Sequence, residues 1–359
     1  MKPLKIAFII VGAKIGAGFA SGKEIFEYFA KFGAKSLLFV PLLFFAFYFF
    51  TYTLLCFGSK FLNFNLKDGN NLLSKKICVF NKTFNMFNAF MFVTFLILSA
   101  AMFTGLISLF GTYFPNASRQ LIYFFVVILT IVLIKMSFNT ISSISYIIVP
   151  MIIVCILINA VFSLNLSSFT SSLGSYGSAL LPMLTILYAS QNTFLASFVI
   201  IKSGSGLCPS EQKKVSLIVA VILCSLIVVG ILCFLFNPSL SYFSMPFAEI
   251  SKEVDVVYSY IFGFIIFSSI ITTYATTITS LKEYFKNKRF TSIYMLCTIL
   301  LLSTINFSHI VKYLYPLIGV FGLIYIYKAY TACNLSFKSF FQNTNKSIHN
   351  ASQNAKDNS

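Results

Sequence analysis

The residues of this chain that could carry out specific chemistry are polar residues embedded in long apolar segments. Gln191 and Asn192 lie midway along the apolar stretch 176–202. Amide and hydroxyl groups of this kind suit the reversible binding of a solute or of a small cation such as Na⁺. The hydroxyl groups crowd a second stretch, 256–281, at Ser268, Ser269, Thr272, Thr273, Thr276, Thr277, Thr279 and Ser280.

Both sets also have a purely structural interpretation. Buried amides bond between membrane helices, and each such bond contributes about 0.6 kcal/mol. Serine and threonine often donate to the carbonyl four residues back in their own helix. We expect Gln191 and Asn192 to line a site, because an amide at the bilayer centre is costly without a partner, a ligand or water. For the hydroxyl stretch both interpretations stay open.

Catalysis is not expected, because the groups that enzymes use are few and scattered. The chain contains 2 histidines, His309 and His349, and 9 acidic residues. None of them lies at metal-ligand spacing, and no phosphate-binding loop that could power a pump is present. The 8 cysteines form no C-x-x-C pair, so neither a zinc site nor a disulfide framework is predicted. We therefore expect no enzyme, no metal centre and no cofactor.

The composition places these polar residues in a membrane. Hydrophobic residues make up 58% and charged residues 10% of the 359-residue chain, which is typical of a polytopic membrane protein. A membrane-spanning helix needs about 20 apolar residues. Ten stretches approach that length: 4–31, 36–57, 84–111, 119–137, 141–164, 176–202, 214–236, 256–281, 290–307 and 311–331. The polar segment 332–359 is expected to be a disordered tail.

The positive charges indicate which side each loop faces. With a cytoplasmic N-terminus, 19 of the 26 lysine and arginine residues fall in segments on the cytoplasmic side and 5 on the outer side. This is the inside-positive bias of membrane proteins, and a wrong span count would disrupt it. The net charge of +17 is therefore mainly a topology signal, with some attraction to anionic lipid. Nucleic-acid binding is not indicated, and both termini are predicted to be cytoplasmic.

Two of the spans are predicted to be interrupted helices. The first contains Gly12, Gly16, Gly18 and Gly22, and each glycine costs a helix about 1 kcal/mol relative to alanine. Unpaired backbone groups within a membrane must line a cavity or be covered by protein. The polar run 188–193 interrupts the sixth span at a matching position. Paired interruptions predict an all-α transporter domain, 4–331, built from two five-span repeats, 4–164 and 176–331.

The run from Gly16 to Ile25, GAGFASGKEI, resembles the first-helix signature of the YkvI-type membrane proteins. These belong to the amino acid–polyamine–organocation superfamily, whose shared architecture is the five-plus-five inverted repeat of the LeuT fold. The resemblance implies a protein of the bacterial cytoplasmic (inner) membrane. It also implies a sodium site formed by carbonyls near Lys14 and Ala17 and by hydroxyls of Ser268 and Ser269, or of Thr272 one turn later. The substrate would lie against Ala17, Gly18, Phe19, Ala20, Ser21 and Gly22 of the first span, which would be unwound there, and against Tyr188, Ser190, Gln191 and Asn192 of the sixth.

Lys14 departs from the pattern that the resemblance implies. An ammonium beside the carbonyls of the break would replace Na⁺ and repel it, because like charges repel strongly at short distance. A buried lysine that gains and loses a proton would instead couple transport to H⁺. The alternative is that the side chain of Lys14 extends to the inner membrane surface.

The function predicted from these features is secondary active transport of a small solute, with H⁺ favoured over Na⁺ as the coupling ion. Exposed N–H groups at a helix start attract a carboxylate, so a small zwitterion or anion, an amino acid first, is the expected solute. Two alternatives stay open: a non-transporting sensor or assembly factor with the same fold, and a channel. The partners expected are the solute and the lipid bilayer, and the sequence makes no prediction of the oligomeric state.

Overall fold

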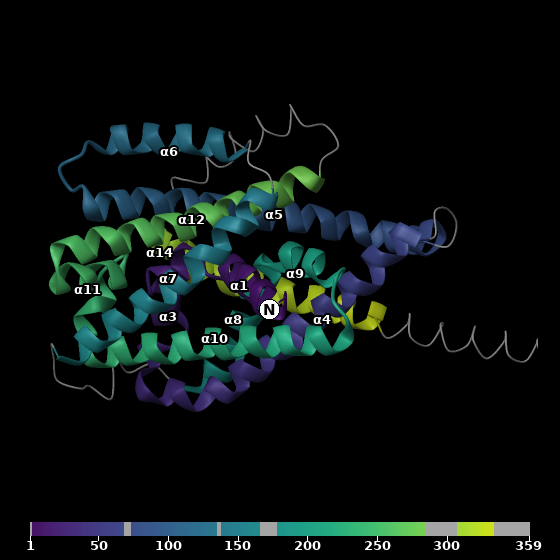
Figure 1. The fold of residues 1–359 in the computed structure, drawn as a ribbon, viewed down its shortest axis with the longest axis horizontal. Helices are drawn as coiled ribbons and strands as arrows, with labels where there is room; N and C mark the ends of the chain where they lie inside the picture. The colour runs from purple at the N-terminus through teal and green to yellow at the C-terminus, as the bar shows by residue number, and fades with distance from the viewer. Residues whose placement is uncertain (1, 68–72, 135–137, 166–177, 285–306, 334–359) are drawn as a thin grey trace, which may run out of the picture.

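The computed structural model describes residues 2–67, 73–134, 138–165, 178–284 and 307–333 of the chain, and every regular element within these ranges is a helix (Figure 1). The helices of the first half are α1 (Lys2–Lys14), α2 (Ala17–Ala20), α3 (Lys23–Tyr28), the 3₁₀ segment η1 (Ala30–Phe39), α4 (Val40–Lys67), α5 (Leu73–Tyr113), α6 (Arg119–Ile134) and α7 (Phe138–Asn165). Those of the second half are η2 (Ser178–Leu180), α8 (Leu181–Leu195), α9 (Ser197–Gly204), α10 (Pro209–Phe236), η3 (Pro238–Tyr242), α11 (Pro246–Val254), α12 (Val256–Tyr284), α14 (Phe307–His309) and the π-helical turn η4 (Ile310–Leu314). The helix continues after η4 to the end of the apolar span Phe307–Cys333.

The described residues contain five helices that are long and apolar enough to cross a membrane, and the bent pair α8–α9 would make a sixth. They coincide with the predicted spans two, three, six, seven, eight and ten, while the shorter apolar helices Arg119–Ile134 and Ile148–Ser163 coincide with spans four and five. The predicted ninth span, 290–307, lies outside the described residues except for its last residue. The chain is an all-α polytopic membrane protein, and the count of ten spans stays a prediction.

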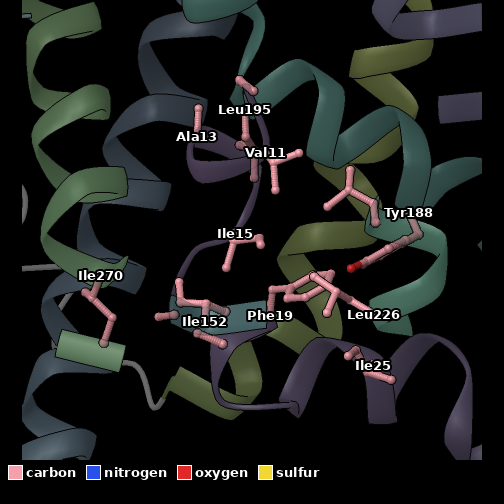
Figure 2. Packing of buried hydrophobic residues seen from close by; sticks show 14 of the residues in the cluster. Val11, Ala13, Ile15, Phe19, Ile25, Ile152, Tyr188, Leu195, Leu226 and Ile270 are labelled. Carbon is pink, nitrogen blue, oxygen red and sulfur yellow. The ribbon is translucent and has the colours of Figure 1, made fainter. Parts of the chain in front are cut away.

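The centre of the bundle is α1 and the chain that follows it. Helix α1 packs against α7, α10 and α12, and α2 packs against α5 and α12 (Figure 1). Figure 2 shows Val11, Ile15 and Phe19 in this apolar core, with the ring of Tyr188 directed toward them from α8. The first span is therefore surrounded by protein, as an interrupted membrane helix must be.

The first span is interrupted twice, at Ile15–Gly16 and at Ser21–Gly22. Gly22 adopts a left-handed conformation, with φ of 84°, which favours glycine over every other residue. The expectation that all of Ala17–Gly22 is unwound is wrong, because Ala17–Ala20 forms one helical turn. Its closing bonds run from the N–H of Ala20 to the carbonyl of Gly16, 2.9 Å, and from Ser21 to Ala17, 3.0 Å.

The sixth span is also interrupted, but at Ala196 and not at the predicted run 188–193. Helices α8 and α9 meet there at 64°. The polar residues lie inside α8 because their side chains find partners without unwinding the backbone. Thr193 accepts a bond from Lys14, Gln191 accepts one from Tyr28, and Ser190 donates to the carbonyl of Gly319.

The sequence-based span assignment missed helix α11, which covers the second break of the first span. Its nine residues are too few to form an apolar stretch of membrane-spanning length. The N–H of Phe247, near the start of α11, donates to the carbonyl of Ser21 at 2.9 Å. Asn159 of α7 in turn donates to the carbonyl of Phe247 at 3.2 Å. These bonds connect the break to α11 and to α7.

Candidate functional site

The first break exposes the carbonyl of Ile15, and hydroxyl groups of α12 satisfy it. Ser269 donates to this oxygen at 2.7 Å and Thr273 at 3.2 Å. Of the three hydroxyl residues predicted to bind sodium, only Ser269 has this contact. Thr272 donates to a carbonyl of its own helix, that of Ser269, and Ser268 is half-buried. Thr273 was not among the predicted residues, although its spacing of four from Ser269 places both on one helix face.

Lys14 is buried, and its ammonium lies on a different side of the first span. Only 3% of the residue is exposed, so it does not extend to the membrane surface. Its Nζ donates to Thr51 of α4 at 2.9 Å and to Thr193 of α8 at 3.0 Å. It also lies 4.8 Å from the centre of the Phe47 ring. The ammonium was expected beside the carbonyls of the break, but its hydrogen bonds go to hydroxyls of α4 and α8, whereas the Ile15 carbonyl is bound by Ser269 and Thr273 of α12.

A second polar group forms around the other break. We call it the tyrosine–glutamate cluster, and it consists of Glu24 and Tyr28 of α3, Tyr188 and Gln191 of α8, and Tyr315. The hydroxyl of Tyr28 donates to Oε1 of Gln191. Glu24 lies near Tyr28, Tyr188 and Tyr315. The cluster thus brings together three segments that are far apart in the sequence.

The turn at Gly22 places Glu24 against Gly18. A Cβ atom on Gly18 would overlap the Glu24 carboxyl group, so the carboxyl lies directly over the glycine backbone. The position of Gly22 favours the same arrangement, since a Cβ there would meet the ring of Phe247 at 2.9 Å. Gly18 therefore leaves room for the Glu24 carboxyl, and Gly22 leaves room for the Phe247 ring.

Four atoms of the cluster lack hydrogen-bond partners. Among the described residues, five buried side-chain atoms make no hydrogen bond, and four of them are Glu24 Oε2, Tyr188 Oη, Gln191 Nε2 and Tyr315 Oη. Tyr188 and Asn192 lie close enough to the Glu24 carboxyl to interact with it, but the geometry leaves Oε2 and the Tyr188 hydroxyl without a hydrogen bond. A buried polar atom without a partner costs about 1–3 kcal/mol. Four of them in one place indicate a site for a polar ligand or for water.

Aromatic rings form the wall of the cluster. The Tyr188 ring lies 4.8 Å from that of Tyr28, 5.1 Å from that of Phe29 and 6.1 Å from that of Phe47, measured between centroids. Phe47 also contacts the Lys14 ammonium. One wall of rings therefore connects Lys14 with the tyrosine–glutamate cluster.

The structure separates the predicted substrate residues into two groups. Gly18, Tyr188, Gln191 and Asn192 lie at or beside the tyrosine–glutamate cluster. The others serve the fold. Ala17, Phe19 and Ala20 are part of the apolar core, Ser21 donates to the carbonyl of Gly18 at 3.2 Å, Ser190 donates to Gly319 at 2.9 Å, and Gly22 forms the left-handed turn.

Sequence reasoning missed Glu24, Tyr28 and Tyr315 as site residues. The first two could have been found, because a carboxylate in an apolar span is unusual and Tyr28 follows it by one helical turn. Tyr315 has no such local signal. Its backbone N–H donates to the carbonyl of Ile310, which closes the π-helical turn η4, and α3 packs against that turn. Single π-turns of this kind are frequent at functional sites.

Solved structures with a similar fold include an inward-facing conformation of Mhp1, with a TM-score of 0.55 and 10% sequence identity over 89% of this chain and 73% of the other. A closed conformation of Mhp1, a nucleobase-cation-symport-1 family transporter with bromovinylhydantoin bound, has a TM-score of 0.43 and 12% identity over 93% and 74% of the two chains. No model of a known protein family matches the sequence, and no curated protein does. The first structural match confirms the predicted LeuT-like fold. Membership of the YkvI-type family stays a prediction.

Proposed function

We propose that this protein is a secondary active transporter that moves a small polar solute across the membrane by alternating access. The observation that carries the proposal is the group of unpartnered polar atoms beside the interrupted first span. Discontinuous helices that meet near the middle of a bundle form the substrate sites of secondary transporters. The fold shared with Mhp1 is consistent with this activity. The solute carries an amino group, and amino acids, which the sequence predicts, are the first class to test.

The coupling ion proposed is H⁺, and Lys14 is the residue that carries it. Its partners are two hydroxyl groups and one aromatic ring. Among the described residues, no carboxylate lies within ion-pair distance of Lys14. A buried ammonium without a carboxylate is costly to keep charged. Loss of the Lys14 proton during the transport cycle would therefore cost little free energy.

Proteoliposomes that contain the purified protein test this function. Uptake of radiolabelled amino acids should saturate, show counterflow and need no sodium, and it should respond to an imposed pH gradient. Binding without counterflow would instead favour a sensor, and flux without saturation would favour a channel. Strict sodium dependence would contradict proton coupling and would return the cation site to Ser269 and Thr273.

A lysine variant tests the assignment of the coupling residue. Lys14→Ala should keep counterflow, which needs no driving force, but should lose the response to the pH gradient. Lys252→Ala is the matched control, because Lys252 lies on the surface of α11 and pairs with Glu249 at 3.2 Å. A pH response that survives in Lys14→Ala would remove Lys14 from the coupling mechanism.

A further inference from the structure

We propose that the tyrosine–glutamate cluster binds the ammonium group of a small organic amine and disfavours solutes that carry a carboxylate. This inference rests on the proposed function and specifies its substrate class. It revises the sequence-based expectation of an amino acid. It is carried by the position of Glu24, by the absence of a cation within ion-pair distance of it among the described residues, and by the groups that surround it.

The first step is the position of the Glu24 carboxyl. A carboxylate solute was expected to approach the backbone of the first span, where glycine leaves room. The structure fills that space with a carboxylate of the chain itself, because Glu24 lies over Gly18. A carboxylate on the solute would place a second negative charge beside an ionised Glu24 with no cation between them, and like charges disfavour each other.

The second step is the charge balance. Glu24 is 3% exposed, and among the described residues no lysine, arginine or histidine lies within ion-pair distance of it. Its neighbour Lys23 is 3.7 Å from Glu27, and Lys14 is bound by threonines. A buried carboxylate is costly unless it is paired. The ammonium of a bound solute would provide the missing charge.

The third step is the chemistry of the surrounding groups. An ammonium has several N–H donors, and the acceptors it can reach are Glu24 Oε2 and the unpartnered hydroxyls of Tyr188 and Tyr315. Aromatic faces also attract a desolvated cation, and Tyr28 and Tyr188 provide two of them. Gln191 Nε2 is an unpartnered donor, which suits a neutral acceptor on the solute, such as a hydroxyl or a carbonyl oxygen.

The experiment compares amines with their parent amino acids. Binding to the purified protein in detergent is measured by calorimetry for four pairs: isobutylamine and valine, phenylethylamine and phenylalanine, agmatine and arginine, and histamine and histidine. The two members of each pair differ only in the carboxylate. At least one amine should bind about tenfold or more tightly than its amino acid, a difference of about 1.4 kcal/mol. Equal or tighter binding by every amino acid, or no binding by any amine, would overturn the inference.

Variants locate the preference. Glu24→Gln keeps the size of the side chain and removes its charge, and it should abolish the preference for the amine. Glu27→Gln is the matched control on the same helix, because Glu27 is paired with Lys23 and Lys31, and it should keep the preference. If Glu24→Gln does not fold, Tyr315→Phe removes one unpartnered hydroxyl and should weaken amine binding severalfold. Full amine binding by a folded Glu24→Gln protein would contradict the inference.

Counterflow separates this inference from the proposed function. Amine binding without counterflow would contradict transport and leave the binding site intact. Counterflow of amino acids with no preference for amines would leave transport intact and contradict the assigned substrate class.

Discussion

At the scale of single residues, the site depends on the contact between Gly18 and Glu24. The carboxyl lies where a Cβ on residue 18 would be, so the side chain at position 18 controls the position of Glu24. The neighbouring α8 residue Asn192 is 2% exposed and donates to the carbonyl of Tyr188 at 3.3 Å. The contact between the polar side of α8 and α3 is the bond from the Tyr28 hydroxyl to Gln191.

Gly18→Val should abolish transport and leave folding largely intact. The added side chain displaces the Glu24 carboxyl, which is the flexible end of its side chain, while the apolar contacts of α2 remain. Counterflow and circular dichroism of the purified variant measure the two effects. Gly111→Val is the control, because a Cβ on Gly111 meets no atom within 4 Å. A Gly18→Val protein with full counterflow would show that this glycine serves helix packing alone.

Asn192→Ala should raise the apparent KM by about tenfold, which corresponds to about 1.4 kcal/mol for one lost hydrogen bond to the solute. The amide lies beside Glu24, within the region where the amine is proposed to bind. Initial uptake rates over a range of solute concentrations give the KM. An unchanged KM together with a lower melting temperature would assign Asn192 to packing.

At the scale of elements, each break in the first span is covered by a different helix. Helix α12 supplies two hydroxyls to the carbonyl of Ile15, and α11 supplies the N–H of Phe247 to the carbonyl of Ser21. Without these donors, the carbonyls would be unpaired inside a bundle that excludes water, which costs several kcal/mol for each group. The two breaks are therefore stable only when α11 and α12 cover them.

The double variant Ser269→Ala, Thr273→Val should be less stable by about 1–3 kcal/mol, the cost of one buried acceptor without a donor. The melting temperature in detergent measures this loss. Ser225→Ala is the control, because Ser225 is exposed on α10 and donates to Ile222 of its own helix. A double variant with the melting temperature of the wild type would show that another donor, such as water, can bond to the Ile15 carbonyl.

At the scale of the whole molecule, the bundle presents apolar side chains to the outside and keeps polar residues in its centre. Large apolar side chains are exposed on α6, α7 and α12, as expected for surfaces in contact with lipid, and they include Phe124, Val154, Val161, Val257 and Phe264. The core is mostly apolar as well, and Lys14, Glu24 and Gln191 are buried within it. In a bilayer such polar groups are stable only when protein surrounds them.

The orientation of the bundle can be tested at the two ends of α10. Cys208 is exposed just before the helix, and Tyr242 is 89% exposed beyond its other end. In a background without the other native cysteines, an impermeant thiol reagent should label Cys208 only from the cytoplasmic side. A Tyr242→Cys protein that also lacks Cys208 should be labelled only from outside. Labelling of Cys208 on intact cells would contradict the inside-positive assignment.

The sequence alone was sufficient to predict the membrane class, most of the apolar spans and the two interruptions. These features are local, because the length of an apolar run and the glycines at 12, 16, 18 and 22 report directly on helix formation in a bilayer. The interruption of the sixth span was predicted at 188–193, a few residues before the observed bend at Ala196. The reason is that a polar run stays helical when its side chains find partners in other helices.

Only the tertiary structure could decide what the polar residues contact. Lys14 finds threonines on α4 and α8, Glu24 lies over Gly18 beside two tyrosines of other helices, and Thr273 joins Ser269 at Ile15. Thr51, Thr193, Ser269 and Thr273 are distant in sequence from the first-span groups that they contact, and no local pattern predicts these pairs. In a membrane, each buried polar group must be satisfied within the bundle. The three-dimensional arrangement of the helices therefore determines which groups remain free to bind a solute.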